Sequence, residues 1–214
     1  MRTALAVLLL APAALEARGL PKPVEPTAPI VLSRADEIRL ARSAAPASVS
    51  AEARVWVLSN GRYEVVEPGT SGAACFVARS QRLSLEPECG DTEAEATWFT
   101  VERWQVEQRL AGRTPAEVDR TTRDSLAAGR SRVPRRPATV YMMSSAQVLY
   151  DENGKFAGRW MPHTMLYFPN LNATDLGVAA GHSDHAAPSV DRPGTPWSNI
   201  VTVVRSWVDP APAP

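Results

Sequence analysis

Apolar and polar positions follow a helical period in the middle of the chain. Large apolar residues recur there every three or four positions, as they do on the buried face of a helix. The stripe consists of Ala94, Trp98, Val101 and Trp104. This spacing predicts a helix that continues to Leu110.

Capping signals predict two further helices. Thr114, Pro115 and Glu117 have the order of an N-cap, a first-turn proline and a capping-box acid, so a second helix follows the first and forms a hairpin with it. Near the N-terminus, Ser33 and Asp36 give the same signal for a helix over about 34–45.

Short runs of β-branched and aromatic residues predict strands on both sides of the helical hairpin. The runs are 54–58, 63–66, 74–78, 139–143, 148–150, 156–160, 164–168 and 199–204. The last run is the most apolar, which favours a central place in the sheet. Residues 86–90 contain proline and glycine and are interpreted as a turn. The elements together predict an α+β fold: a largely antiparallel sheet with an N-terminal helix and an inserted helical hairpin.

The N-terminus has the layout of a secretory signal peptide. Arg2 precedes an apolar run over 4–10, and small residues follow, with possible cleavage after Ala13 or Ala17. The alternative is an uncleaved membrane anchor, although the run is shorter than the roughly 20 residues that a spanning helix needs. We therefore expect a signal peptide over 1–17 and a periplasmic or secreted protein with no membrane span in the mature chain.

Proline content divides the remaining chain. Residues 18–32 are proline-rich and are expected to form an extended tether, and residues 209–214 are expected to be a disordered tail. The segment between them, 33–208, is long enough for a single α+β domain.

The two cysteines are expected to pair. In an exported protein, Cys75 and Cys89 favour a disulfide. The alternative is a thiolate nucleophile with His163 as its base. No cysteine-protease motif surrounds either cysteine, which favours the disulfide.

The three histidines are the first candidates for chemistry. His163, His182 and His185, with Asp184, supply the ligand types of a zinc-like site, although the closely spaced pair lies in a Gly-, Ala- and Ser-rich stretch. The alternative is a solvated loop with incidental histidines, and a packed role for His163. We expect no cofactor, with a divalent metal such as zinc as the alternative.

Charge and aromatic residues suggest further contacts. The formal net charge is zero, which argues against a nucleic-acid partner. Arg135 and Arg136 belong to a basic run that could bind phosphate or carboxylate, or could be a solvated linker. Trp160 and Trp197 lie beside prolines and are candidates for ligand contact, although tryptophans more often fill a core.

Local patterns in the chain resemble a group of uncharacterised exported bacterial proteins with two cysteines. The patterns are Gly69–Cys75, Glu86–Cys89, Tyr141–Ser144 and Pro162–Met165. The resemblance supports the paired cysteines and the exported location, and it implies no activity.

Two functions are compatible with these features. The first is an exported, non-catalytic domain with a binding or structural role, whose partner is a cell-envelope component or another protein. The alternative is a small metal-dependent hydrolase that uses the histidine cluster. A nucleophile elbow, a Walker A loop and a dinucleotide-binding glycine pattern are all absent from the sequence.

Overall fold

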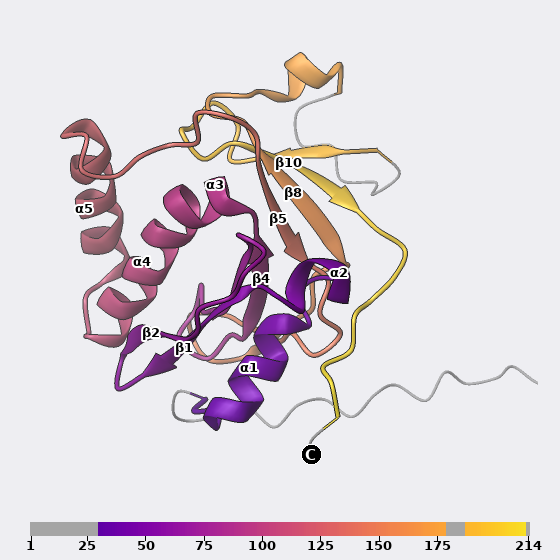
Figure 1. The fold of residues 1–214 in the computed structure, drawn as a ribbon. Coiled ribbons are helices and arrows are strands. Elements are labelled where there is room, and N and C mark those ends of the chain that lie inside the picture. The colour runs from indigo at the N-terminus through magenta and orange to yellow at the C-terminus, as the bar shows by residue number, and fades with distance from the viewer. Residues whose placement is uncertain (1–29, 179–186, 213–214) are drawn as a thin grey trace, which may run out of the picture.

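The computed structural model describes residues 30–178 and 187–212 (Figure 1). Its main feature is an eight-stranded sheet with the strand order β2-β1-β3-β4-β5-β8-β10-β9. Neighbouring strands are antiparallel except for β1 and β3. The predicted α+β class and the largely antiparallel sheet are confirmed.

The strands match most of the predicted runs. The main sheet contains β1 (Arg54–Ser59), β2 (Arg62–Glu67), β3 (Ala74–Ala78), β4 (Glu86–Gly90), β5 (Ala138–Met142), β8 (His163–Tyr167), β9 (Ser189–Asp191) and β10 (Asn199–Val203). A separate hairpin contains β6 (Leu149–Tyr150) and β7 (Phe156–Gly158). Asn60 and Gly61 both have positive φ, which confirms the tight turn between β1 and β2.

Two of these strands differ from the sequence interpretation. Residues 86–90 form strand β4 between β3 and β5, not a turn. β10 is not central, because only β9 separates it from the edge of the sheet. Its apolar residues are half-buried, so the composition of β10 reflects strand propensity more than a central position.

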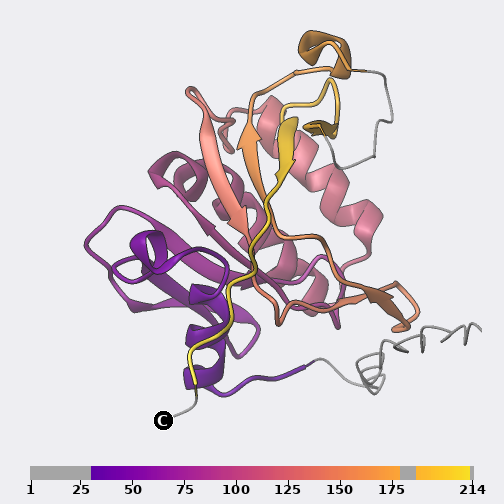
Figure 2. The same cartoon turned by 90° about the vertical axis from the view of Figure 1, so that its right-hand side faces the viewer.

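Helices cover both faces of the sheet (Figures 1 and 2). On one face lie α1 (Arg34–Arg42) and the short α2 (Ala47–Ser50). The other face carries a continuous helical segment made of α3 (Thr92–Ala94), a π-helical turn η1 (Glu95–Phe99) and α4 (Thr100–Leu110), followed by α5 (Pro115–Ala127). A short 3₁₀ turn, η2 (Ala173–Leu176), follows β8. The inserted helical hairpin is therefore confirmed.

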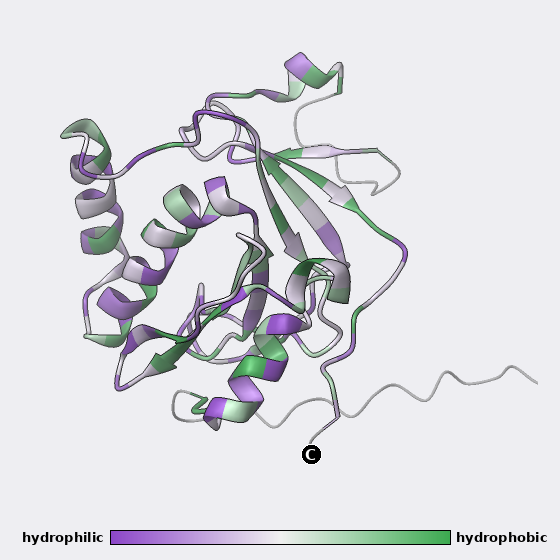
Figure 3. Cartoon of the chain, in the orientation of Figure 1, coloured by the Kyte–Doolittle hydropathy of each residue, from purple (hydrophilic) through white to green (hydrophobic). Residues whose placement is uncertain are grey.

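The predicted caps are present. The Ser33 side chain accepts a hydrogen bond from the backbone N–H of Asp36 at the start of α1. Thr114 and Glu117 form the reciprocal bonds of a capping box at the start of α5. Figure 3 shows hydrophobic and hydrophilic residues mixed along α5, which agrees with a helix that packs outside α4.

The sheet separates two hydrophobic clusters. Because side chains alternate along a strand, Phe76 of β3 faces α4 and its neighbour Val77 faces α1. The cluster under α4 contains Trp98, Phe99 and Val140. The cluster on the α1 side contains the disulfide.

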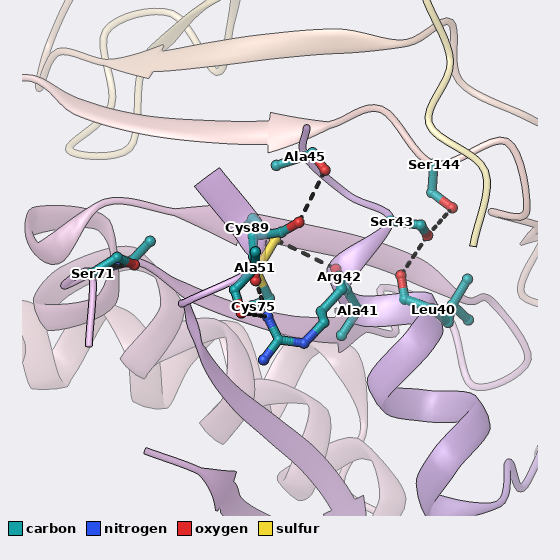
Figure 4. The surroundings of a disulfide bond; sticks show 12 residues. Leu40, Ala41, Arg42, Ser43, Ala45, Ala51, Ser71, Cys75, Cys89 and Ser144 are labelled. Atoms are coloured by element: carbon teal, nitrogen blue, oxygen red, sulfur yellow. Dashed lines mark hydrogen bonds between the residues drawn. A yellow bond between two sulfur atoms is a disulfide. The ribbon is translucent and has the colours of Figure 1, made fainter. Parts of the chain in front are cut away.

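Cys75 and Cys89 form the predicted disulfide, deep under α1 (Figure 4). They are direct partners in the β3–β4 register, with their Cα atoms 4.1 Å apart. The Sγ atom of Cys89 lies 3.4 Å from the carbonyl oxygen of Ala41. The bridge therefore joins two strands, and not a strand to a turn.

The described chain is packed at both of its ends. Ile30 and Leu32 contact the α1-side cluster, just before the predicted domain start. At the other end, the N–H of Val208 donates to the carbonyl oxygen of Met143 at 2.8 Å, and Asp209 accepts a hydrogen bond from Ser145. The predicted signal peptide and most of the tether lie outside the described residues.

Candidate functional site

A cavity of about 460 Å³ lies on the α4 face of the sheet. Its walls come from β4, η1, α4, β8, β9 and β10. Carboxyl groups gather in its wall, so we call it the carboxylate cavity. They belong to Glu86, Glu88 and Glu102.

The three glutamates reach the cavity from two elements. Glu86 and Glu88 alternate along β4 and therefore point to the same face, while Glu102 comes from α4. Their exposed fractions are only 6%, 3% and 8%. Glu86 accepts a 2.8 Å hydrogen bond from the backbone N–H of Ser80. Glu88 and Glu102 hydrogen-bond to each other, and their Oε2 atoms receive no donor from any other described residue.

Burial shifts the titration of this cluster. Removal from water, followed by the negative charge of Glu86, raises the pKa of Glu102 to about 7. Burial also raises the pKa of Glu88 well above its ordinary value, and the charges of Glu102 and Glu86 add to this effect. Neighbouring carboxyl groups disfavour ionisation of each other, so the Glu88–Glu102 pair retains a proton near neutral pH.

Aromatic rings and sulfur atoms form the remaining wall. Trp98 stacks on Tyr167 with the ring centroids 5.6 Å apart, and Met142 and Met165 complete this surface. Trp160 lies at the rim with half of its surface exposed. The cavity thus combines an apolar surface with a few polar groups, as small-molecule sites do.

Arg192 places a positive charge beside this wall. Its Cζ atom lies 4.5 Å from the centroid of the Trp98 ring, and its side chain also pairs with Asp191 at 3.5 Å. The φ angle of Arg192 is +51°, which is uncommon for a residue other than glycine. Backbone outliers of this kind are found preferentially at ligand sites.

His163 contributes its ring to the same cavity. Its Nδ1 lies 2.7 Å from the carbonyl oxygen of Met161, so Nδ1 carries the proton and donates it. Burial lowers the pKa of His163, which favours the neutral ring. The centroid of its ring is 6.5 Å from that of Trp160.

A second cavity of about 490 Å³ adjoins the first. The two share Ser80, Trp98, Glu102 and Arg192 in their walls. Trp197 lines the second cavity and is 7% exposed, with its ring centroid 5.4 Å from that of Trp98. Trp197 thus lies in the turn before β10 with its indole packed into the core, and its role as a ligand contact stays a prediction.

The structure unites only some of the predicted site residues. His163 and Trp160 meet in the carboxylate cavity. Arg136 instead pairs with Glu93 at 3.2 Å, and the backbone N–H of Arg135 donates to the same carboxylate. Both arginines lie outside the two cavities.

The rest of the predicted metal site cannot be placed. His182, Asp184 and His185 lie outside the described residues. Within residues 30–178 and 187–212 no group of His, Cys, Asp and Glu has an arrangement that could hold a metal ion. The predicted metal site therefore stays a prediction.

Sequence reasoning missed the carboxyl groups. Glu102 lies four residues after Trp98 and four before Val106, so a charged residue interrupts the buried stripe of the helix. Glu86 and Glu88 have the period of a strand, but Pro87 and Gly90 obscured it. An acid on an apolar stripe was the available signal, because acids are rarely buried without a reason.

No known protein family, curated protein or solved structure matches the chain. None of the helices in the part of the chain that the structure describes is long and apolar enough to cross a membrane.

Proposed function

We propose that this protein is an exported, non-catalytic binding domain that takes a small organic cation with an apolar body into the carboxylate cavity. The apolar run behind Arg2 supports export, and the disulfide is compatible with it. The partner would then be a small molecule and not a protein.

The observation that carries this proposal is the buried pair of carboxyl groups, which receives no donor from any other residue in the part of the chain that the structure describes. Glu88 and Glu102 hydrogen-bond to each other through the proton that the pair retains, and no other described residue donates to either Oε2 atom, although both side chains line a cavity. A buried polar group without a hydrogen bond costs about 1–3 kcal/mol. An ammonium group in the cavity would supply both the donors and the opposite charge.

The size and wall of the cavity support a small ligand. A volume of about 460 Å³ falls within the range of about 300–1,000 Å³ that is usual for small-molecule sites. The exposed ring of Trp160 can contact an apolar body or a cation.

Calorimetric titration of the purified protein with phenethylamine tests the proposal. We expect this amine to bind at pH 7.5 and its neutral analogue, 2-phenylethanol, to bind at least about tenfold more weakly, because the alcohol lacks the charge. Glu88→Gln should weaken amine binding. Glu64→Gln, an exposed acid on β2, should leave it unchanged. Equal binding of amine and alcohol, or no binding of either, would overturn the proposal.

The second candidate function is a small hydrolase. A carboxyl group such as Glu102, with a pKa of about 7 beside a cavity, is suited to general acid–base chemistry. His163 lines the same cavity, so the predicted metal-dependent form would use it together with His182, Asp184 and His185. Metal analysis of the purified protein tests that form. One equivalent of zinc, lost in His182→Ala and His185→Ala, would favour it over simple binding.

A further inference from the structure

The two adjoining cavities have opposite hydrogen-bonding character. In the carboxylate cavity, the Glu88–Glu102 pair receives no donor from any other described residue. The wall of the second cavity instead contains residues with unpartnered donors: the indole nitrogens of Trp197 and of Trp98, which lines both cavities, and the Nε atom of Arg109 have no partner among the described residues. Both tryptophans are more than nine-tenths buried, so solvent does not satisfy their N–H groups.

The charges follow the same division. Glu86 and Glu88 line only the carboxylate cavity, whereas Arg109 and Arg123 line only the second one. Asp119 also belongs to the second wall and offsets part of this positive charge. Glu102 and Arg192 line both cavities, so the change of sign occurs at their common boundary.

The boundary between the cavities is built around one aromatic residue. Trp98 lines both cavities and sits in the π-helical turn η1. Such turns are rare and occur frequently at functional sites. A ligand that contacts Trp98 can therefore extend into both cavities.

We propose that the two cavities hold the opposite ends of one zwitterionic ligand, a short peptide with free termini. Its ammonium group would bind Glu88 and Glu102. Its carboxylate would accept hydrogen bonds from the indole N–H groups and from the arginines of the second cavity. This inference rests on the proposed binding of a cation in the carboxylate cavity, and it adds the anionic end and the chemical class of the ligand.

Three forms of one dipeptide test the contributions of its ammonium and carboxylate ends separately. Calorimetric titrations at pH 7.5 would use alanyl-phenylalanine, its C-terminal carboxamide and its N-acetyl derivative. We expect the free dipeptide to bind most tightly. Each blocked form should lose about tenfold or more in affinity, because each lacks one set of charge-assisted hydrogen bonds.

Two variants test the anionic end. Arg123→Gln should weaken binding of the free dipeptide and leave binding of the carboxamide unchanged. Trp197→Phe keeps an aromatic ring but removes the indole donor, so it should act in the same direction. The matched control is Arg120→Gln, because Arg120 is exposed on the same helix and lies outside both cavity walls. Arg109 is unsuitable because it also donates to the carbonyl oxygen of Arg79.

The outcomes distinguish this inference from the proposed function. If the carboxamide binds as tightly as the dipeptide, or if phenethylamine binds while the dipeptide does not, the zwitterion inference is overturned and cation binding stands. If neither phenethylamine nor any form of the peptide binds, both proposals fail.

Discussion

Glu102 is an ionisable residue on the buried, apolar face of its helix. It occupies the apolar face of α4, between Trp98 and Val106, yet it bears a carboxyl group. Burial disfavours its charged form, so the folded state holds a proton that the unfolded chain has already released near neutral pH. The free energy of unfolding therefore depends on pH through this residue.

The raised pKa of Glu102 predicts the direction of that dependence. In the folded protein the pKa of Glu102 is about 7, above the ordinary glutamate value of 4.5, so the folded protein binds more protons than the unfolded chain between these two pH values. The free energy of unfolding should therefore be highest below about pH 4.5 for this group. It should fall by about 1–3 kcal/mol as the pH rises through 7. Urea unfolding at a series of pH values measures this slope.

Substitution identifies the group responsible. Glu102→Gln removes the titrating carboxyl group and should make the slope between pH 4.5 and 7 shallower, although Glu88 titrates in the same direction. Glu64→Gln, on the exposed side of β2, should keep the slope of the unaltered protein. A slope that is identical in all three proteins would contradict the assignment.

At the scale of the element, β4 contains most of what the sequence did not reveal. Its residues are Glu86, Pro87, Glu88, Cys89 and Gly90, none of which is a β-branched or aromatic strand former. All five residues of β4 are nevertheless buried. α1 covers one face of the strand, and on the other face its glutamates line the cavity in the interior of the protein. Tertiary packing therefore overrides local propensity in this strand. The helical hairpin was easier to predict, because its stripe and caps are local signals.

The disulfide between β3 and β4 predicts a measurable contribution to stability. A crosslink that closes a loop of this length is worth about 3 kcal/mol through the entropy of the unfolded chain. Cys75→Ala/Cys89→Ala should lower the free energy of unfolding by about that amount in urea titrations. A reductant should destabilise the unaltered protein similarly and leave the double variant unaffected. A double variant as stable as the oxidised protein would contradict this contribution.

At Gly90, α3 and η1 pack so closely against β4 that there is no room for a side chain. A Cβ atom on Gly90 would lie 2.7 Å from the Cζ atom of Phe99 and 2.8 Å from the Cβ atom of Ala94. Gly90→Ala should therefore destabilise the protein by about 1–3 kcal/mol, as overpacking in a core does. Thermal and urea unfolding measure this loss.

A double-mutant cycle checks the cause. In the background of Phe99→Leu, which shortens the clashing ring, Gly90→Ala should cost less than it does alone. An equal cost in both backgrounds would show that the Phe99 ring is not the obstacle.

At the scale of the whole molecule, the sequence predicted the architecture better than the site. The α+β class, the disulfide partners and the helical insertion follow from periodicity, caps and residue type. The site depends on long-range placement: Glu88 comes from one strand, Glu102 from a helix and His163 from a strand much later in the chain. No local pattern specifies that these three share one cavity. Trp160 was proposed as a ligand contact because of the nearby proline, and its side chain does line this cavity.

The predicted signal peptide gives a test of the whole chain. When the full chain is produced in a bacterium, the extracytoplasmic fraction should contain a protein that begins after Ala13 or Ala17, as read by intact mass and N-terminal sequencing. Leu9→Arg interrupts the apolar run and should leave the precursor uncleaved inside the cell. A membrane-bound product with the full mass of 23.1 kDa would contradict cleavage and indicate an anchor.

The order of strands in the sheet has a consequence for how the molecule is assembled in time. From β3 onward, β4, β5, β8 and β10 lie side by side in the order in which they occur in the chain. Synthesis proceeds from the N-terminus, and an exported chain also emerges from this end, so α1, β1 to β4 and both cysteines are available before the rest of the sheet. This half can close and oxidise first, and later strands can add to its free edge one after another. The walls from β8, β9 and β10 come last, so the carboxylate cavity is completed only in the final stage of folding.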